Sequence, residues 1–236
     1  EIETSEMVKY ADNAWHALKI GFANEIGNIC KSLGVDSHDV MDIFCQDRKL
    51  NISPAYLKPG FAFGGMCLPK DLRALLYKAH SMDVTVPILD SVLPSNVHQV
   101  ERGLRAVVET GNRKVGILGI SFKAGTDDLR ESPVVELAER LIGKGYDLRI
   151  YDHNVNVARV NGANRDYILK RIPHISSLMV PSIDEIVDHA ETVVVGNQSP
   201  EFKDIPKRMS DSHVVVDLVR VSRARSVSGV YEGLSW

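Results

Sequence analysis

The sequence predicts an α/β protein in which a helical domain is followed by a doubly wound, parallel-sheet domain of Rossmann-like type. Three observations support this fold class. Apolar side chains recur at helical spacing up to about residue 110. After Gly111, short apolar runs alternate with helix-like segments, as crossover helices between parallel strands require. Finally, 44% of the 236 residues are apolar, enough for a core in each of two modest domains. We therefore expect domains at residues 1–110 and 111–236.

The first domain is expected to contain four helices. Gly34 ends the first one, Asp36 caps the second, and a stretch rich in glycine and proline follows over residues 51–70. Pro69 is a favourable first residue for the third helix, and Pro94 is expected to kink the fourth or to set its start. The expected helices span residues 5–33, 69–79 and 87–110, and the second helix runs from residue 37 through Phe44 and includes Cys45.

The second domain is expected to alternate strands with helices. Ser132 and Ser182 are the expected N-caps of two of its helices. The apolar runs predict parallel strands over residues 114–120, 148–151, 192–195 and 213–219.

Composition argues against several classes of function. The formal net charge is −3, and Lys and Arg are scattered, so nothing favours nucleic acid as a partner. No apolar run reaches the length of a membrane span, and no metal-ligand cluster occurs among the eight dispersed histidines. The three cysteines lack C-x-x-C spacing, which suits a reducing compartment. We expect a cytoplasmic protein with no metal and no membrane contact.

Cys67 is the strongest candidate for a reactive side chain. It follows the Gly64-Gly65 pair and precedes a predicted helix, whose N-terminal N–H groups and dipole favour a thiolate. Lys70 adds positive charge, and Asp71 supplies a carboxylate that is able to act on water. The alternative is an inert packed cysteine, which fits Cys30 and Cys45 because each falls inside a predicted helix.

Two further polar features have uncertain roles at this stage. Lys9, Asn13, His16 and Asn24 fall within about a quarter of the circumference of the first helix, which fits a binding face or a solvated stripe equally well. The long loop over residues 121–133 follows a strand, where doubly wound folds bind ligands. In this loop Lys123 and Arg130 are candidates to hold phosphate, while Thr126, Asp127 and Asp128 are candidates to order the loop. The strand before it carries no G-x-G-x-x-G fingerprint, so the usual dinucleotide site is missing.

Three segments in this order resemble the nucleotide-sugar 6-dehydrogenase family, which includes UDP-glucose dehydrogenase. They are Lys9-x-x-x-Asn13, Gly64 to Asp71 (GGMCLPKD) and Gly119 to Pro133 (GISFKAGTDDLRESP). The resemblance covers essentially the whole chain and corresponds to the family's central and C-terminal domains. Residues 56–61 (YLKPGF) are most similar to the branch that oxidises GDP-mannose.

The resemblance implies a four-electron oxidation of a sugar C6 alcohol to a carboxylate with two NAD per turnover, GDP-mannose to GDP-mannuronate. Cys67 would add to the aldehyde intermediate as a thiolate, and the resulting thiohemiacetal would be oxidised to a thioester. Asp71 would assist hydrolysis, and Lys9 and Asn13 would stabilise the oxyanion.

Other roles follow from the same resemblance. Lys70 and Arg130 would contact NAD, which would be bound mainly by an N-terminal domain that is absent from this sequence. The family assembles as dimers or higher oligomers through the first long helix, with sites completed across subunits. The residues expected to bind the nucleotide sugar are Lys9, Asn13, His16, Asn24, Tyr56, Leu57, Lys58, Phe61, Gly64 and Lys123.

Three alternatives remain open. The substrate is UDP-glucose or UDP-N-acetylmannosamine instead of GDP-mannose. The chain is a nucleotide-binding or dimerisation module without chemistry, in which Cys67 only packs. Or Cys67 serves a thiol acyltransferase or hydrolase, which would need a histidine close in space.

Overall fold

The computed structural model describes residues 2–49, 55–83, 85–156, 160–222 and 229–236. Its contacts divide the chain into two compact units. The helical unit comprises residues 1–99 together with 235–236, and the sheet unit comprises residues 100–234. The division falls inside the fourth helix, whereas the sequence suggested a boundary just after that helix. The first part of the turn-rich stretch, residues 51–54, lies outside the described residues.

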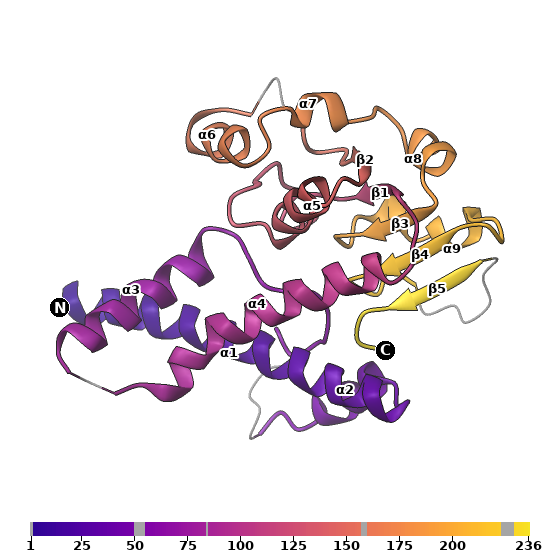
Figure 1. The fold of residues 1–236 in the computed structure, drawn as a ribbon. Coiled ribbons are helices and arrows are strands. Elements are labelled where there is room, and N and C mark those ends of the chain that lie inside the picture. The colour runs from indigo at the N-terminus through magenta and orange to yellow at the C-terminus, as the bar shows by residue number, and fades with distance from the viewer. Residues whose placement is uncertain (1, 50–54, 84, 157–159, 223–228) are drawn as a thin grey trace. The chain divides into compact units, whose positions relative to one another are not determined.

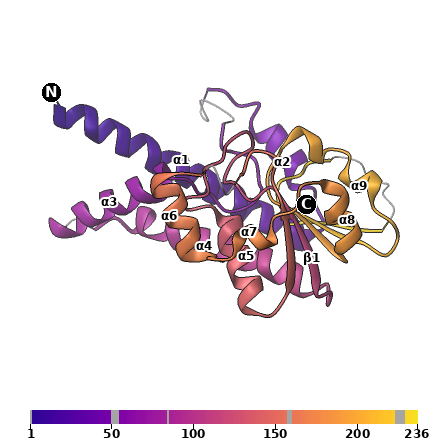
Figure 2. The same ribbon diagram turned by 90° about the horizontal axis from the view of Figure 1, so that it is seen from above.

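The helical unit is built on α1 (Ile2–Leu33), α2 (Ser37–Phe44), α3 (Cys67–Ser81) and α4 (Pro87–Val108). The helices α1 and α3 run side by side (Figures 1 and 2). The core of this unit consists of buried apolar side chains from α1, α3, α4 and the segment before α3: Ala14, Ala17, Phe63, Leu72 and Val92.

Local sequence explains where most of these helices begin and end. Gly34 adopts a φ of 70° after α1. Asp36 caps α2, because its carboxylate accepts a hydrogen bond from the backbone N–H of His38 (2.9 Å). The prediction for α3 was wrong by two residues: the helix begins at Cys67, not at Pro69. Proline is tolerated there because N–H groups of the first turn have no partner within the helix. Pro94 lies inside α4 and does not set its start.

The last two residues described return to the helical unit. The Ser37 hydroxyl donates to the carbonyl oxygen of Ser235 (2.5 Å), and the Lys31 ammonium donates to that of Trp236 (3.1 Å). The Trp236 ring meets His38 edge-on, with ring centroids 5.1 Å apart. Residues 235–236 are therefore anchored on α1 and α2.

The sheet unit holds five parallel strands in the order β2-β1-β3-β4-β5. They are β1 (Lys114–Leu118), β2 (Asp147–Tyr151), β3 (Thr192–Val195), β4 (Val214–Asp217) and β5 (Val230–Gly233). Because β1 pairs with β2 on one side and β3 on the other, the winding direction reverses there, which confirms the doubly wound prediction. The strand β5 was missed because it is short and mostly accessible.

Helices connect these strands: α5 (Pro133–Gly143), α6 (Gly162–Arg171), α7 (Ile175–Leu178), α8 (Ile183–His189), η1 (Pro200–Phe202) and α9 (Ile205–Arg208) (Figure 1). The helix α8 packs closely on β1, since a Cβ at Gly116 would lie 2.4 Å from Ile186 Cγ2. Ser182 caps α8 as predicted, accepting from the N–H of Glu185. Ser132 precedes α5, but its hydroxyl donates to the carbonyl of Ile120 instead of capping the helix.

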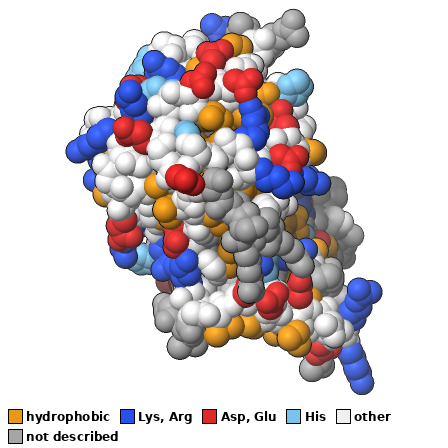
Figure 3. Space-filling model, turned by 90° about the vertical axis from the view of Figure 1, so that its right-hand side faces the viewer, with side chains coloured by type: hydrophobic (Ala, Val, Ile, Leu, Met, Phe, Trp, Pro, Cys, Tyr) orange, Lys and Arg blue, Asp and Glu red, His pale blue; other side chains and the backbone are white. Residues whose placement is uncertain are grey.

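Acidic and basic side chains are interspersed over the face shown in Figure 3. Within the described residues, no helix is both long and apolar enough to cross a membrane. In the same part of the chain, no three His, Cys, Asp or Glu side chains gather as a metal site would require.

Candidate functional site

The buried carboxylate of Asp71, in the second turn of α3, is the centre of a polar cluster in the helical unit. Its side chain is only 1% exposed. The Asn13 amide donates to Asp71 Oδ2 (2.7 Å), and Lys9 Nζ lies 3.7 Å from the same oxygen. Lys70 Nζ lies 3.1 Å from Oδ1. The polar stripe of α1 thus supplies two of the three groups named here, Lys9 and Asn13.

The charges in this cluster stabilise one another. Burial alone would raise the pKa of Asp71, but hydrogen bonds from Lys70 and Asn13 and the charges of Lys70 and Lys9 outweigh it, so the pKa is lowered. The hydrogen bond to Asp71 and its negative charge raise the pKa of Lys70. At neutral pH the cluster therefore contains an anionic carboxylate with two ammonium groups beside it.

Cys67 is exposed and lies one helical turn before Asp71. Residues four apart in a helix lie on the same face, so the thiol and the carboxylate are neighbours along α3. Met66, the N-cap residue, offers no side-chain hydrogen bond to the first turn, whose N–H groups point toward the helix start. An accessible sulfur at this helix end has room to meet a ligand.

The other two cysteines differ from Cys67. Cys30 is buried within α1. Cys45 is the C-cap of α2, so the prediction that it lies inside a helix was wrong by one residue. Burial, followed by the charge of Asp42, raises the pKa of Cys45, which disfavours its thiolate.

The rest of the polar stripe of α1 faces the segment over residues 56–61. The rings of His16 and Tyr56 are 4.9 Å apart between centroids, and Tyr56 adopts a positive φ of 64°. The Asn24 amide accepts from the N–H of Gly60 (3.0 Å) and donates to the carbonyl of Phe61 (3.2 Å). All four stripe residues therefore contact residues 56–71, so the stripe is more than a solvated surface.

The remaining candidates differ in accessibility. Leu57 and Phe61 are buried, Gly64 is half-buried, and Lys58 is exposed. Asn24 is also buried, and one N–H and one lone pair of its amide are already used by the backbone of Gly60 and Phe61. A contact between this amide and a sugar stays a prediction.

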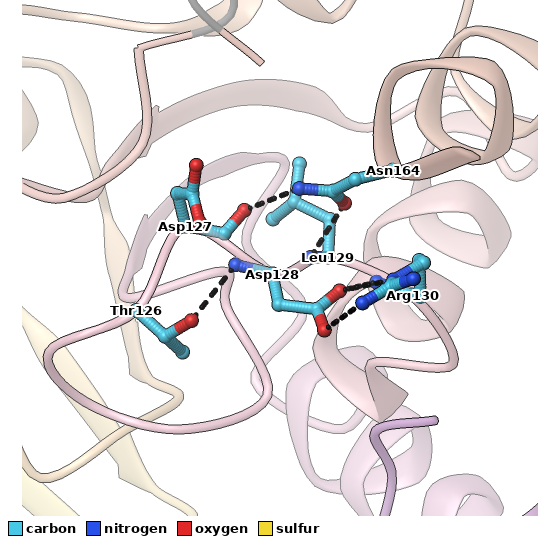
Figure 4. Close-up of polar contacts among 6 residues, drawn as sticks. All are labelled: Thr126, Asp127, Asp128, Leu129, Arg130 and Asn164. Atoms are coloured by element: carbon cyan, nitrogen blue, oxygen red, sulfur yellow. Dashed lines mark hydrogen bonds and ion pairs between the residues drawn. The ribbon is translucent and has the colours of Figure 1, made fainter. Parts of the chain in front are cut away.

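In the sheet unit, the loop between β1 and α5 is ordered by its own side chains (Figure 4). The guanidinium of Arg130 forms two hydrogen bonds with the Asp128 carboxylate (2.8 and 2.7 Å), and Thr126 Oγ1 accepts from the N–H of Asp128 (3.1 Å). From α6, the Asn164 amide binds the carbonyl of Asp127 and the N–H of Leu129. Lys123 is exposed on the same loop.

Protonation of Asp128 should loosen this loop. Its pKa is lowered mainly by the hydrogen bonds from Arg130. The ion pair therefore stabilises the fold at pH values above the unfolded-state pKa of Asp128, and this stabilisation is lost as the pH falls through its folded-state pKa. We expect Asp128→Asn to lower Tm by about 1–3 °C at pH 7, because such partly exposed pairs contribute up to about 1 kcal/mol. The difference from wild type should begin to shrink as the pH falls below about 4, the unfolded-state pKa, and should vanish below the lowered folded-state pKa, as measured by thermal unfolding followed by circular dichroism. The neighbouring exposed carboxylate provides the control, Asp127→Asn, and an equal loss of Tm in that variant would contradict the expectation.

Three buried residues at the carboxyl ends of strands were not predicted. Asp152 Oδ2, after β2, accepts from the N–H and the hydroxyl of Ser121 (3.1 and 2.9 Å) and from the N–H of Ile120 (3.0 Å). Asn197, after β3, donates to the Ser121 hydroxyl (3.1 Å). A Cβ at Gly119 would lie 2.5 Å from the Asn197 side chain, which explains glycine there. The signal available in the sequence was a polar residue soon after each of three apolar runs.

A cavity of about 470 Å³ opens beside the end of β2 and α7. Tyr151, Asp152 and His153 line one part of it, and Ser176 and Met179 line another. The tyrosine hydroxyl donates to Glu201, and burial, reinforced by this bond, raises the pKa of Tyr151. No predicted site residue lines this cavity.

Comparison with known proteins places the chain in a family. The central-domain model of the UDP-glucose/GDP-mannose dehydrogenase family matches residues 3–98, and its UDP binding domain model matches residues 116–224. The GDP-mannose 6-dehydrogenase of Pseudomonas putida is 53% identical over 236 residues, which is 100% of this chain and 54% of the relative. The chain thus spans about half the length of this relative.

Solved structures agree with this assignment. A ternary complex of GDP-mannose dehydrogenase from Pseudomonas aeruginosa has a TM-score of 0.73 at 53% identity, covering 100% of this chain and 54% of that one. A UDP-glucose dehydrogenase from Pyrobaculum islandicum has a TM-score of 0.81 at 33% identity, covering 98% and 50%. Two domain models of one family that match most of the chain, and identity above one half over its whole length, show that the chain belongs to the UDP-glucose/GDP-mannose dehydrogenase family.

Proposed function

We propose that this chain forms the nucleophile-bearing and nucleotide-sugar-binding part of an NAD-dependent enzyme that oxidises GDP-mannose to GDP-mannuronate. The observation that carries the proposal is the cluster of Lys9, Asn13 and Lys70 around buried Asp71, one helical turn from exposed Cys67. The choice of GDP-mannose rests on the relatives that share 53% identity with the whole chain.

The proposed chemistry assigns a role to each of these groups. The Cys67 thiolate adds to the carbonyl carbon of the C6 aldehyde, and the resulting tetrahedral carbon can lose hydride. Lys9 and Asn13 donate hydrogen bonds to the developing oxyanion. Once the thiohemiacetal has been oxidised to a thioester, Asp71 orients and deprotonates the water that releases the acid.

Bound NAD would supply the hydride acceptor. Lys70 is exposed at the cluster and is the residue of the helical unit proposed to contact it. Arg130 is proposed to do so from the sheet unit, although Asp128 already pairs with its guanidinium. The strand β1 provides Gly116 and, just after it, Gly119, but no G-x-G-x-x-G sequence. We therefore propose that the main dinucleotide site belongs to a domain outside these 236 residues.

The nucleotide sugar is proposed to bind along residues 56–64 of the helical unit. Tyr56 and Lys58 offer an aromatic face and a cation, His16 stacks beside Tyr56, and Gly64 allows close approach to the backbone. By the resemblance to the family, Lys123 is also proposed to bind the nucleotide sugar. The remaining proposed contacts are Asn24, Leu57 and Phe61.

The substrate proposal is tested by NADH formation in the complete protein that contains these residues. We expect kcat/KM for GDP-mannose to exceed that for UDP-glucose and for UDP-N-acetylmannosamine by at least about a hundredfold, since buried groups left without a partner discriminate strongly. Equal or faster turnover of either UDP-sugar would contradict the proposal.

We also propose that two copies of the chain associate through α1. Val8, Trp15 and Phe22 are seven residues apart and therefore share one face of this helix, away from the polar stripe. They are 54%, 51% and 42% exposed. Apolar side chains in such a row are typical of a helix that packs against a partner.

Replacing the central residue of this row should weaken the dimer. We expect Trp15→Glu to raise the dimer dissociation constant by at least about thirtyfold, because buried interface aromatics commonly contribute about 2 kcal/mol or more. Sedimentation velocity over a concentration series measures this. The control is Ile43→Glu, which changes another apolar residue that is 70% exposed but lies on α2. A wild-type protein that stays monomeric, or equal effects of both variants, would contradict the proposal.

A further inference from the structure

Residues 57–66 form no regular secondary structure, although most of them are buried; Lys58 and Met66 are exposed. Leu57, Phe61, Ala62 and Phe63 are at most 8% exposed, yet the segment forms no strand or helix. Its backbone N–H and C=O groups therefore need partners from elsewhere, because an unpaired buried polar group costs free energy. The partners that the structure provides are side-chain amides.

Three amides from α1 and α4 bind this segment, and a fourth, Asn28, binds one of the three. We call the four residues the amide clamp: Asn24, Asn28, Asn96 and Gln99. The Asn96 amide accepts from the N–H of Phe63 (2.8 Å) and donates to the carbonyl of the same residue (2.9 Å). A carboxamide has one donor and one acceptor side, so Asn96 pairs with Phe63 as a neighbouring strand would.

The other members of the clamp act on Gly60. Its N–H donates to Asn24 Oδ1 (3.0 Å), and its carbonyl accepts from Gln99 Nε2 (2.5 Å). Gln99 is 2% exposed, and its own carbonyl oxygen accepts from Asn28 (3.2 Å). The backbone of residues 60–63 is thus held from both sides, by α1 and by α4.

This held segment lies between two groups of proposed ligand contacts. Tyr56 and Lys58 precede it, and Cys67 opens α3 four residues after Phe63. We propose that the amide clamp, and Asn96 and Gln99 in particular, positions residues 56–64 for the nucleotide sugar, so that the substrate meets a preformed site. The inference rests on the proposed function. It assigns a positioning role to Asn28, Asn96 and Gln99, which lie outside the three segments that resemble the family. They are positioning residues and do not touch the reacting atoms.

Preorganisation has a specific consequence for binding. A segment that has lost its partners must be ordered again by the ligand, and this cost weakens binding of the nucleotide sugar. The nucleophile is held separately, in the first turn of α3, so its intrinsic reactivity should not change. Affinity and thiol reactivity therefore separate a positioning role from general damage to the fold.

The test is alkylation of Cys67 by iodoacetamide in the complete protein, with GDP-mannose as protecting ligand and mass spectrometry to locate the label. We expect Asn96→Ala and Gln99→Met to raise the half-protecting GDP-mannose concentration about tenfold or more. The rate of alkylation without ligand should stay within about twofold of wild type. Asn96→Asp places a carboxylate oxygen against the Phe63 carbonyl that the amide N–H contacts, so it should raise this concentration at least as much as Asn96→Ala.

The matched control is Ser95→Ala. It removes a hydrogen bond between α4 and α1, from Ser95 to Glu25 (2.6 Å), without touching the segment, and should leave protection unchanged. Protection of all Asn96 and Gln99 variants at the wild-type concentration would overturn the inference while leaving the proposed function intact. An equal effect of Ser95→Ala would also overturn it, because the loss of any contact between α1 and α4 would then be enough to weaken protection by GDP-mannose. If GDP-mannose does not protect wild-type Cys67 at any concentration, that result contradicts the proposed function and, with it, the inference.

Discussion

Replacing Cys67 with serine is expected to lower kcat for NADH formation from GDP-mannose by at least about a thousandfold, because the thiolate is the proposed nucleophile. A serine hydroxyl at this helix end remains protonated at neutral pH and adds to the aldehyde poorly. Binding of GDP-mannose should change little, since the thiol is exposed and serine is of similar size. Steady-state kinetics and calorimetry with GDP-mannose on the same preparation separate the two effects.

The control for Cys67→Ser is Cys45→Ser. Cys45 is a half-buried cysteine of the same unit whose pKa is raised, and its replacement should leave kcat within about twofold. Comparable turnover of the two variants would rule out a cysteine-dependent mechanism. That outcome would favour a nucleotide-binding module in which Cys67 has no chemical role.

The second large effect is expected from Asp71→Asn. An amide is no base, so kcat should fall by about 10²–10⁴-fold at the hydrolysis step, and a thioester at Cys67 should accumulate. Because the pKa of Asp71 is lowered, the wild-type carboxylate is ionised throughout the neutral range, and raising the pH should not restore the variant. Intact-mass measurement of the enzyme after mixing with GDP-mannose and NAD detects the acyl adduct.

A nearby carboxylate outside the cluster serves as the comparison. Asp12 is exposed on α1, between Lys9 and Asn13, and Asp12→Asn should retain wild-type turnover. If Asp71→Asn reduces kcat without any adduct, water activation is not its role. The carboxylate would then act chiefly by holding Lys9 and Asn13 in place.

The hydrophobic periodicity and the capping and turn residues of the sequence predicted most of the fold, because both signals act over only a few residues. Gly34 and Asp36 mark the ends of neighbouring helices, and the TVVV run over residues 192–195 is the strand that its composition indicates. Errors arose where such local signals were weak. The start of α3 was placed at Pro69 because proline is favoured at the first helical position, although proline is also tolerated elsewhere in the first turn.

The site was predictable as a set of residues but not as a set of contacts. The spacing of Lys9 and Asn13 showed that they share a helix face. Their partner Asp71, however, lies far away in the sequence, 58 residues after Asn13. No local rule predicts which carboxylate such a face meets. The same reason hid Asn164, which orders the β1–α5 loop from α6, and Gln99, which binds Gly60 from α4.

The anchoring of residues 235–236 on α1 and α2 makes the sheet unit an insertion within the helical unit. The chain leaves the helical unit inside α4 and returns to it after Leu234, so two covalent connections join the units instead of one. A backbone cleavage at the α4 connection would divide the chain into two pieces, and the sheet unit would stay linked to α1 and α2 through the noncovalent anchoring of residues 235–236. A fragment that ends at Gln99 would lack the segment that covers Ser37 and His38, which are 0% and 7% exposed in the intact chain. For anyone dissecting this protein, residues 1–99 therefore belong with residues 235–236, and a cut at Gln99 divides the helical unit.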